Sequence, residues 1–562
     1  MKHRTRWLVL CVALLTSALL ALPTAGLAEH DNREFFGPIS DLGHSPFASG
    51  PGPFDNINSD LAFWGNTAYQ GNFNGFRIID LGDGANPDAG IRYDQCNGGQ
   101  GDVMIWDDLL IRTWDSPAGA TAVCGEMEDP ENPGTMIPRP VPLGFEGLHF
   151  FDVSDPNDIE LVHEVPLNQA RMQADFGRNG CGSHTATLVP DQDTGRLFIY
   201  NGASNGNCPG TEIIEVFPDD VTESDFMRFE NLGRSCHDIA VFLGEVKRGV
   251  CAGGNGFTVF RMDPNSNGNG SIVNPQHIDS VAVNGVTIGH TATFTWDGSR
   301  FVFGHEPGGG TGAACEDQDP DRDRTFFYYN TDSVEKIGTW TMPRAQGADE
   351  NCTLHNINFI PTTDGSDLLV SGNYQAGTWV TDWTDPARPT DLAFADPPSL
   401  TPGTLTLGGA WSTYWYNGFM YETEITRGLN VFSLDDPRAD DAVEFDFLNP
   451  QTQMQSIGQN VVGESRINIK HTGKPHRFKG SVKSSEDACV AQRNVSIFKR
   501  RNNGSSVNVG NTTTNNTGNY SLRHNRGGAG RYYAVARRQI VTEGINTTDC
   551  LRAQSRTKTF NK

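Results

Sequence analysis

Short apolar segments that end at glycine, asparagine or aspartate recur along almost the whole chain. Examples are RLFIYNG at 196–202, SRFVFGHE at 299–306 and DLLVSGNY at 367–374. Their β-branched and aromatic residues, followed by turn-forming residues, are typical of strands. No long segment has the 3.6-residue spacing of an amphipathic helix, so the pattern predicts an all-β fold.

Two strand motifs recur in step along most of the chain. The first reads glycine (threonine in one copy), apolar, any residue, two apolar residues and a polar residue, usually before a turn with Asp or Pro. The second lies upstream of each copy, as HDIAVFL lies upstream of GFTVFRMDP. Because each motif occurs seven times, we predict a seven-bladed β-propeller at 29–447, with a solenoid of equal repeat length as the alternative. The seven copies of the first motif are GFRIIDLGD, GLHFFDVSDP, GTEIIEVFPD, GFTVFRMDP, TFFYYNTDS, GTWVTDWTDP and GLNVFSLDDP.

The motifs GLHFFDVSDP and HDIAVF resemble the LVIVD-repeat proteins, which are secreted or surface β-propellers of bacteria and archaea. The resemblance covers residues 55–440, although several copies of the motif are degenerate. It implies a propeller fold and an extracellular location. It implies no particular activity, because no general biochemical activity is well established for the family.

The last hundred residues have a different pattern. Segments such as RNVSIFKRR and GRYYAVARR alternate apolar and polar residues between turn signals, which predicts a small Ig-like or transthyretin-like β-sandwich at 465–562. The preceding stretch, 448–464, is rich in Gln, Asn and Gly and is predicted to be a linker. TGNYSL followed by GRYYAVA is similar to carboxypeptidase-regulatory-like modules, which implies an accessory role in adhesion or spacing.

Charge divides between the two regions. Residues 464–562 hold 19 Lys plus Arg against 5 Asp plus Glu, whereas residues 29–463 hold 21 against 63, a net charge of −42. The acidic body argues against nucleic acid or an anionic membrane as its partner and favours cation binding or solubility. The basic C-terminal domain is expected to contact either an anionic cell-wall polymer or polysaccharide, or the acidic propeller beside it.

The N-terminus has the pattern of a secretory signal peptide. Lys2, Arg4 and Arg6 precede an apolar run at 7–22, and small residues follow as far as Ala28. The apolar run is short for a membrane span, and no later segment is apolar enough to be one. We therefore predict a signal peptide at 1–28 and a secreted, extracellular protein.

Cysteine usage agrees with export. Cys11 leaves with the signal peptide, and ten of the 11 cysteines remain, an even number suited to an oxidising compartment. A zinc cluster is the alternative, but no Cys-x-x-Cys pair is present. Pairing in chain order predicts the disulfides Cys96–Cys124, Cys181–Cys208, Cys236–Cys251, Cys315–Cys352 and Cys489–Cys550.

Alignment of the second motif places a histidine or an aspartate at one position in six of the seven repeats, with Ser412 there in the seventh. Inner strands of a propeller converge on the central channel, so these side chains are expected to form a ring around its axis. Imidazole and carboxylate donors suit Zn, Cu, Fe, Ni or Mn. The six candidate metal ligands are Asp60, Asp102, His184, His237, His290 and His355.

The same repetition has a structural explanation. A histidine at the start of a strand can hydrogen-bond to the neighbouring strand and fix one blade against the next. A seven-bladed channel is also wide, so six groups need not reach one ion. Metal ligation and a purely structural ring both remain open.

Weaker signals lie between residues 304 and 323. Alternating carboxylates in CEDQDPDRDR form a candidate Ca²⁺ loop, but Pro320 and a missing glycine depart from the EF-hand pattern, which leaves a solvated acidic loop as the alternative. In GHEPGGGTG, His305 and Glu306 are candidate acid or base residues, although we expect an exposed flexible loop there. The candidate calcium ligands are Asp317, Asp319, Asp321 and Asp323.

These patterns favour a secreted binding or scaffold protein with an extracellular protein or polysaccharide ligand and a candidate metal site. A transition metal would bind to the ring of histidines and aspartates, and Ca²⁺ is a second candidate, for the acidic loop. The alternative is a metal-dependent oxidoreductase with a histidine-ligated metal in the channel. The sequence contains no Gly-x-Ser-x-Gly elbow and no His-Glu-x-x-His motif, so neither of these catalytic signatures supports an enzyme.

Overall fold

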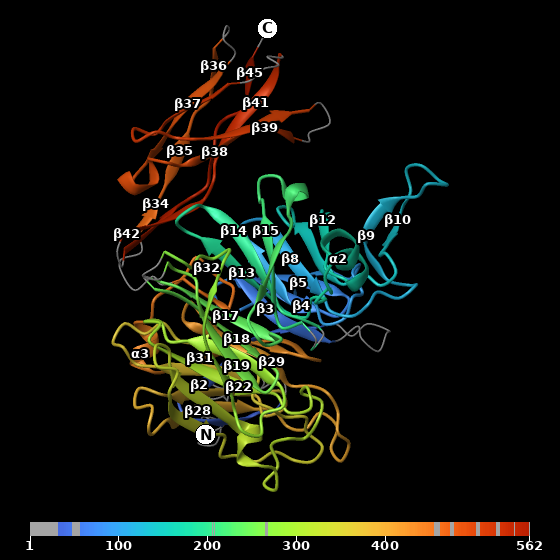
Figure 1. Ribbon diagram of the computed structural model, residues 1–562, viewed down its shortest axis with the longest axis vertical. Helices are drawn as coiled ribbons and strands as arrows, with labels where there is room; N and C mark the ends of the chain where they lie inside the picture. Colours follow the sequence, from blue (N-terminus) through green and yellow to red (C-terminus); the bar gives the residue numbers. More distant parts are fainter. Residues whose placement is uncertain are drawn as a thin grey trace, which may run out of the picture.

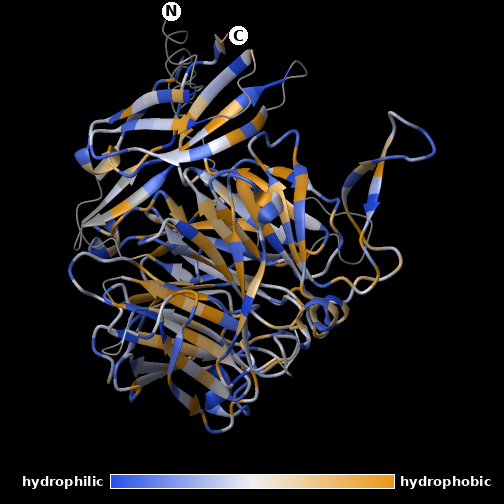
Figure 2. Ribbon diagram, turned by 45° about the horizontal axis from the view of Figure 1, so that its top comes forward, coloured by the Kyte–Doolittle hydropathy of each residue, from blue (hydrophilic) through white to orange (hydrophobic). Residues whose placement is uncertain are grey.

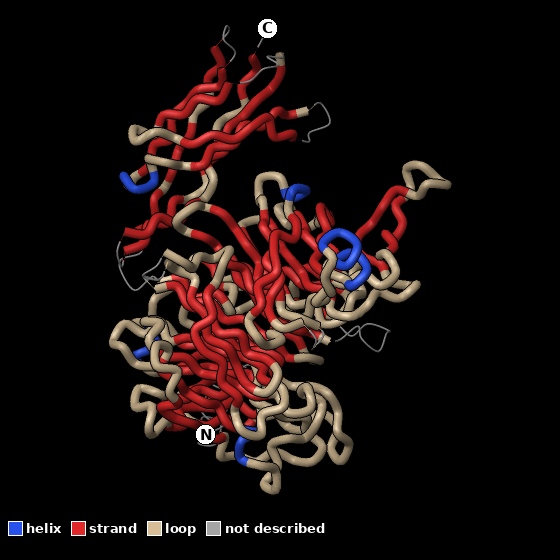
Figure 3. The backbone as a smooth tube through the Cα atoms, viewed as in Figure 1, coloured by secondary structure: helices blue, strands red, loops and turns tan. Residues whose placement is uncertain are grey.

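The fold is all-β, as the sequence predicts (Figure 3). The predicted signal peptide lies outside the described residues. None of the described helices is long and apolar enough to cross a membrane. The computed structural model describes residues 32–47, 57–204, 206, 208–244, 246–264, 268–454, 461–472, 477–501, 506–523, 529–543 and 546–560.

Between residues 34 and 453, the described chain forms seven sheets of four or five strands, which are antiparallel except for one parallel pair. The first strand of each sheet contacts the first strand of the next, and the last of these contacts the first, so the seven inner strands close a ring with a propeller-like arrangement. These inner strands correspond to the second sequence motif. They are β3 (Asn58–Trp64), β7 (Val103–Trp106), β13 (Ala186–Asp191), β17 (Asp238–Leu243), β21 (Gly289–Phe294), β25 (Ile357–Phe359) and β29 (Ala410–Tyr416).

The first sequence motif forms the third strand of every sheet. Each third strand is buried along most of its length, because it packs between the second and fourth strands and against both neighbouring sheets. These strands are β5 (Gly75–Asp80), β11 (Gly147–Asp152), β15 (Gly210–Val216), β19 (Gly256–Arg261), β23 (Thr325–Asn330), β27 (Thr378–Asp382) and β31 (Gly428–Leu434).

Second and fourth strands complete the sheets. The second strands are β4 (Thr67–Asn72), β8 (Leu109–Trp114), β14 (Arg196–Asn201), β18 (Lys247–Gly253), β22 (Arg300–His305), β26 (Leu368–Gly372) and β30 (Phe419–Glu424). The outer strands of the first six sheets are β6 (Ile91–Tyr93), β12 (Glu160–Pro166), β16 (Asp225–Asn231), β20 (Gln276–Ala282), β24 (Lys336–Thr341) and β28 (Thr390–Asp396).

The N-terminal segment closes the ring. Strand β2 (Ile39–Pro46) pairs antiparallel with β31 and supplies the outer strand of the seventh sheet, and β1 (Glu34–Phe36) adds to β28 of the sixth. This pairing holds the two ends of the ring together in one sheet and so closes it.

Apolar side chains fill the spaces between adjacent sheets. Phe257 and Val259 of the fourth sheet pack against Phe301 and Phe303 of the fifth, and all four are fully buried. Burial of each such side chain stabilises the fold by about 2 kcal/mol. Figure 2 accordingly shows hydrophobic residues gathered along the strands and hydrophilic ones in the connecting loops.

A short segment beyond the last sheet runs across five inner strands. β32 (Phe447–Leu448) pairs with β3, and β33 (Thr452–Gln453) pairs with β17. Asn449, which lies between them, hydrogen-bonds to both backbone groups of Ile105 in β7, and Thr452 donates to Leu188 O in β13. Gln453 bonds to both backbone groups of Phe294 in β21. The predicted linker at 448–464 therefore begins as part of the ring, and we call residues 447–453 the crossing segment.

The C-terminal region forms a separate group of sheets at one end of the ring (Figure 1). Its core lies between two of them and includes Phe478, Ile497 and Tyr532. One sheet consists of β35 (Ser465–Ile467), β36 (Lys470–Thr472), β37 (Arg477–Ser484) and β40 (Asn519–Arg523). The other consists of β38 (Asn494–Arg500), β39 (Ser506–Thr513), β41 (Gly530–Ala536), β44 (Ala553–Gln554) and β45 (Lys558–Phe560). A third, small sheet consists of β34 (Val461–Gly463), β42 (Gln539–Glu543) and β43 (Asn546–Cys550).

Candidate metal centre at the channel mouth

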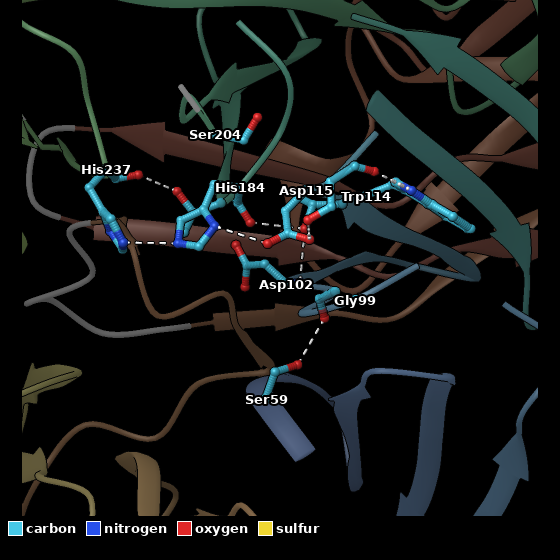
Figure 4. A network of polar contacts seen from close by, with 12 residues as sticks. Ser59, Gly99, Asp102, Trp114, Asp115, His184, Ser204 and His237 are labelled. Atoms are coloured by element: carbon cyan, nitrogen blue, oxygen red, sulfur yellow. Dashed lines mark hydrogen bonds and ion pairs between the residues drawn. The ribbon is translucent and has the colours of Figure 1, made fainter. Parts of the chain in front are cut away.

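The four predicted histidines lie side by side at the start of successive inner strands. Their ring centroids are 4.4 Å apart from His184 to His237, 4.2 Å from His237 to His290 and 4.3 Å from His290 to His355. The Nε2 atoms of His184 and His237 are 2.9 Å apart, and Figure 4 shows His184 between His237 and Asp115. The alignment of the second motif therefore places these residues correctly relative to one another.

Glu306, which the sequence pattern places in an exposed loop, completes the row. Glu306 is 5% exposed, and its Oε2 lies 3.6 Å from His290 Nε2, while its Oε1 lies 3.4 Å from His355 Nε2. The hydroxyl of Tyr374 donates a hydrogen bond to Oε1 at 2.7 Å. The expectation of a surface loop at His305 and Glu306 is wrong, because β22 continues to His305 opposite Gly289 and brings Glu306 beside the start of β21.

Three of these side chains have the spacing of a metal site. One donor atom each from His237, His290 and Glu306 lies within 4.8 Å of the other two. Two imidazoles and one carboxylate form a donor set that binds Zn²⁺ or Fe²⁺ and leaves coordination positions open. His184 and His355 flank the group, so the described ring offers three converging ligands rather than six.

Burial keeps most of the row neutral. The pKa of His290 is well below its usual value because of burial and the neighbouring histidines, and burial lowers the pKa of His355 to about 4. Burial alone would lower the pKa of His237 as well, but the hydrogen bond and the charge of Asp238 outweigh it and raise that pKa. Neutral imidazoles are the form that binds metal ions.

His290 has an unsatisfied polar atom. Its side chain is 3% exposed, and its Nδ1 is buried without a hydrogen-bond partner among the described residues. Buried polar groups in folded proteins nearly always have a partner, so this nitrogen needs an explanation. A metal ion or a water molecule bound beside it would supply one.

The predicted ligands Asp60 and Asp102 lie in the same channel but bond to protein groups. Asp60 accepts hydrogen bonds from the hydroxyls of Ser412, at 2.5 Å, and Tyr414, at 3.1 Å. Asp102 accepts from the backbone N–H groups of Val103, at 3.0 Å, and of Ala186 in the next sheet, at 2.9 Å. Burial raises the pKa of both carboxyls, and for Asp102 the charge of Asp60 adds to this. Both therefore join neighbouring sheets and stand outside the three-residue group.

A cavity of about 10 Å³ is lined by the two aspartates and by three of the histidines, His237, His290 and His355. That volume is close to the space that one water molecule or ion occupies. A much larger cavity of about 750 Å³ lies between the ring and the C-terminal sheets, lined by residues such as Trp106, Asp108 and Tyr533. None of the four histidines lines this larger cavity. The candidate metal ligands therefore lie at the smaller of the two cavities.

Disulfides anchor the loops that carry the histidines. All five predicted cysteine pairs are bonded. Cys236 directly precedes His237, and Cys181 and Cys352 each lie three residues before a histidine of the row. A second group, Cys96, Cys124 and His149, also has the spacing of metal ligands, but its cysteines form a disulfide and offer no thiolate.

The candidate calcium loop does not gather its carboxylates. Within the described chain, no three of the four aspartates come within metal-binding distance of one another. Asp321, which begins the short 3₁₀ helix Asp321–Arg324, is 82% exposed, and Asp323 lies 3.5 Å from Arg322. Asp319 accepts a hydrogen bond from Glu316 N. The solvated acidic loop, which was the alternative, agrees better with this arrangement.

Comparisons with known proteins give no family. No protein-family model and no curated protein matches the chain. Among solved structures, Drosophila Semaphorin 1a, extracellular domains 1–2, matches 70% of this chain and 88% of its own, with a TM-score of 0.32 and 8% identity. The WD40 domain of SCAP from fission yeast matches 90% and 96%, with a TM-score of 0.30 and 7% identity. These likenesses are too weak to carry an argument, and the resemblance to LVIVD-repeat proteins stays a prediction.

Proposed function

We propose that this chain is a secreted, seven-bladed β-propeller protein that binds a divalent transition-metal ion at one mouth of its channel. The closed ring of seven inner strands supports the blade number, and five disulfides suit an oxidising extracellular compartment. His237, His290 and Glu306 would hold the metal.

One observation carries the metal proposal. His290 is buried between two other histidines, with Nδ1 unbonded and a carboxylate 3.6 Å from Nε2. A purely structural histidine would be expected to hydrogen-bond to a neighbouring strand, as His355 does to Trp411 O. A cation held between His290 Nε2 and Glu306 would balance the charge of that carboxylate, and Nδ1 could then donate to a bound water molecule.

The donor set limits the choice of metal. All cysteines near the site are in disulfides, so nitrogen and oxygen are the available donors. Such a set suits Zn, Cu, Fe, Ni or Mn, and a soft ion that needs thiolates is disfavoured. Access would come from the side of His184 and His237, whose side chains are 21% and 19% exposed.

A metal-dependent oxidoreductase is the second candidate function. Three protein ligands leave positions open for water, oxygen or substrate, as in catalytic rather than structural metal sites. Oxygen consumption by the iron- or copper-loaded protein with small phenolic or thiol reductants would favour this candidate. A loaded protein that consumes none would favour metal binding without redox catalysis.

The metal proposal is tested with purified full-length protein. We expect one equivalent of transition metal by elemental analysis, and a Co²⁺ absorption band that saturates at one equivalent. His290→Gln and Glu306→Gln should each lower Co²⁺ affinity by at least roughly tenfold, because each removes one of three ligands. His277→Gln changes an exposed histidine outside the site and should leave binding unchanged. Metal-free protein that folds normally and gives no Co²⁺ band would overturn the proposal.

A further inference from the structure

The sheet of the C-terminal domain in which β37 pairs with β35, β36 and β40 carries positive charge on one face. Along β37, Phe478 and Val482 point into the core, so the alternate residues Arg477, Lys479 and Lys483 point outward. Residues paired with these three in the neighbouring strands share that outward face. We call the resulting set the basic face: Arg466, Lys470, Arg477, Lys479, Lys483 and Arg523.

The register sets like charges directly opposite one another. Arg466 pairs with Lys483, Lys470 pairs with Lys479, and Arg477 pairs with Arg523. Directly opposed like charges destabilise an antiparallel pair, so folding stability does not explain this arrangement.

No acidic residue offsets these charges within the face. Its other paired positions are Thr472, Ser481, Asn519 and Ser521, and in the described chain no carboxylate forms an ion pair with a member of the basic face. Five of the six cations are exposed, and Arg477 is half-buried. The face therefore presents a continuous positive surface to solvent.

The opposite side of the domain contacts the acidic ring. Arg537 forms an ion pair with Asp219, and Ser496 donates a hydrogen bond to the same carboxylate at 2.9 Å. Arg538 lies 3.0 Å from Asp446 and stacks over Trp64 at 4.6 Å. The contacts between the acidic ring and the C-terminal domain are thus made by β38 and by the residues that directly follow β41. The basic face, on the other sheet, takes no part in these contacts.

We propose that the basic face binds a linear anionic polysaccharide. Neighbouring strands are about 4.8 Å apart, and alternate residues along a strand are about 7 Å apart, so the cations form a grid with those spacings. Carboxylates or sulfates that recur along an extended sugar chain can meet several of these cations at once. Each contact releases counterions and adds to the affinity.

The acidic ring favours a narrow polymer over a broad anionic surface. Residues 29–463 carry a net charge of −42, and electrostatic repulsion extends about 8 Å at physiological ionic strength. A bilayer or a stiff duplex that extends beyond the face would come under this repulsion. A single sugar chain can follow the basic face without approaching the ring.

Binding is tested by immobilising the full-length protein and passing polygalacturonate, a linear carboxylated polysaccharide, over it. We expect saturable binding that weakens as salt rises, and no binding of neutral dextran. Lys479→Ser with Lys483→Ser should weaken polygalacturonate binding roughly tenfold or more, because two of the six cations of the basic face are removed. Arg556→Ser with Lys558→Ser removes the same charge from exposed positions outside the face and should change affinity less than twofold.

Thermal unfolding and a charge-preserving variant separate loss of charge from loss of folding. The Lys479→Ser, Lys483→Ser protein should unfold at an equal or higher temperature, because the substitutions relieve like-charge repulsion. Lys479→Arg with Lys483→Arg preserves charge and should preserve binding. Equal loss of affinity in the matched control, equal binding of dextran, or tighter binding of duplex DNA or phosphatidylserine vesicles than of polygalacturonate would each overturn the proposal.

Discussion

The side-chain amide of Gln451 donates a hydrogen bond to Oδ2 of Asp60 at 3.0 Å, and thereby joins the crossing segment to the channel. Asp60 is buried in the first inner strand, and Gln451 comes nearly 400 residues later in the chain. The residues on either side of Gln451 bond to the inner strands β7, β13, β17 and β21. The crossing segment therefore joins sheets that are distant in sequence.

Replacing Gln451 by alanine should destabilise the ring. The substitution leaves Oδ2 of the buried Asp60 with the Tyr414 hydroxyl as its remaining side-chain donor. We expect a loss of about 1–2 kcal/mol in the free energy of unfolding, because a buried carboxylate loses a hydrogen bond. Denaturant unfolding measures this loss. The control Gln173→Ala changes an exposed residue of helix α2 (Gln169–Phe176) and should leave the free energy of unfolding unchanged. Equal stability of both variants would mean that the crossing segment contributes little.

Tyr374 should act on the metal centre through Glu306. Its hydroxyl donates to Glu306 at 2.7 Å and lies 3.0 Å from His355 Nε2. Tyr374→Phe removes the donor that orients the carboxylate, so Co²⁺ affinity should fall roughly tenfold, as for other residues that position a metal ligand.

A matched tyrosine separates positioning from stability. Tyr416 is also buried and donates to a backbone carbonyl, Gly65 O, at 2.8 Å, away from the histidines. Tyr416→Phe should cost a similar amount of folding stability, about 1 kcal/mol, and leave Co²⁺ affinity unchanged. If both variants lower Co²⁺ affinity to the same extent, Tyr374 has no specific role in positioning Glu306.

The strand pattern was predictable because every repeat buries the same positions. In GFTVFRMDP, which forms β19, the buried Phe257 and Val259 alternate with residues on the other face. The second motif, which also recurs seven times, predicted where the inner strands begin, and hence which histidines become neighbours. The disulfides followed from chain order, because each pair within the ring joins segments of the same sheet or of adjacent sheets.

Glu306 and the crossing segment could not be predicted by pattern. Glu306 stands in GHEPGGGTG, whose glycines predict a loop, and it reaches the histidines only through the pairing of His305 with Gly289. The crossing segment is polar because Asn449 and Gln453 bond through their side chains to backbone groups of the ring. Because these contacts are made by polar side chains, the segment lacks the alternation of apolar and polar residues that marks a strand, and its sequence looks like that of a linker. Backbone register across strands would have been needed to find either feature.

Asp367 should make folding stability depend on pH in acid solution. Burial raises its pKa to about 6, despite the Arg300 guanidinium at 2.8 Å and the Tyr328 hydroxyl at 2.8 Å. The folded state therefore holds this proton more tightly than the unfolded state, whose pKa is 3.8. Stability from this group is present below pH 4 and is lost as pH rises to 6, by about 2 kcal/mol.

Asp367→Asn tests this dependence. The amide oxygen can still accept from Tyr328 and Arg300, while the titrating proton is absent. The difference in unfolding free energy between variant and parent should shift in favour of the variant by about 2 kcal/mol between pH 4 and pH 7. Other titrating groups are common to both proteins and cancel in the difference. A difference that stays constant over this range would show that Asp367 titrates normally.

Arg538 should hold the C-terminal domain against the ring through its contact with an aromatic pair. Its guanidinium lies 4.6 Å from the centroid of Trp64 and 5.3 Å from that of Phe447, and these two rings stack at 4.7 Å. The cation–π contact is partly shielded from water, so we expect it to contribute about 1 kcal/mol. Arg538→Gln and Trp64→Leu should each weaken docking, and their double variant should lose about 1 kcal/mol less than the sum of the two. Denaturant unfolding of the protein measures these losses, with Arg556→Gln as the exposed control. Fully additive effects would assign the attraction to the Asp446 ion pair instead.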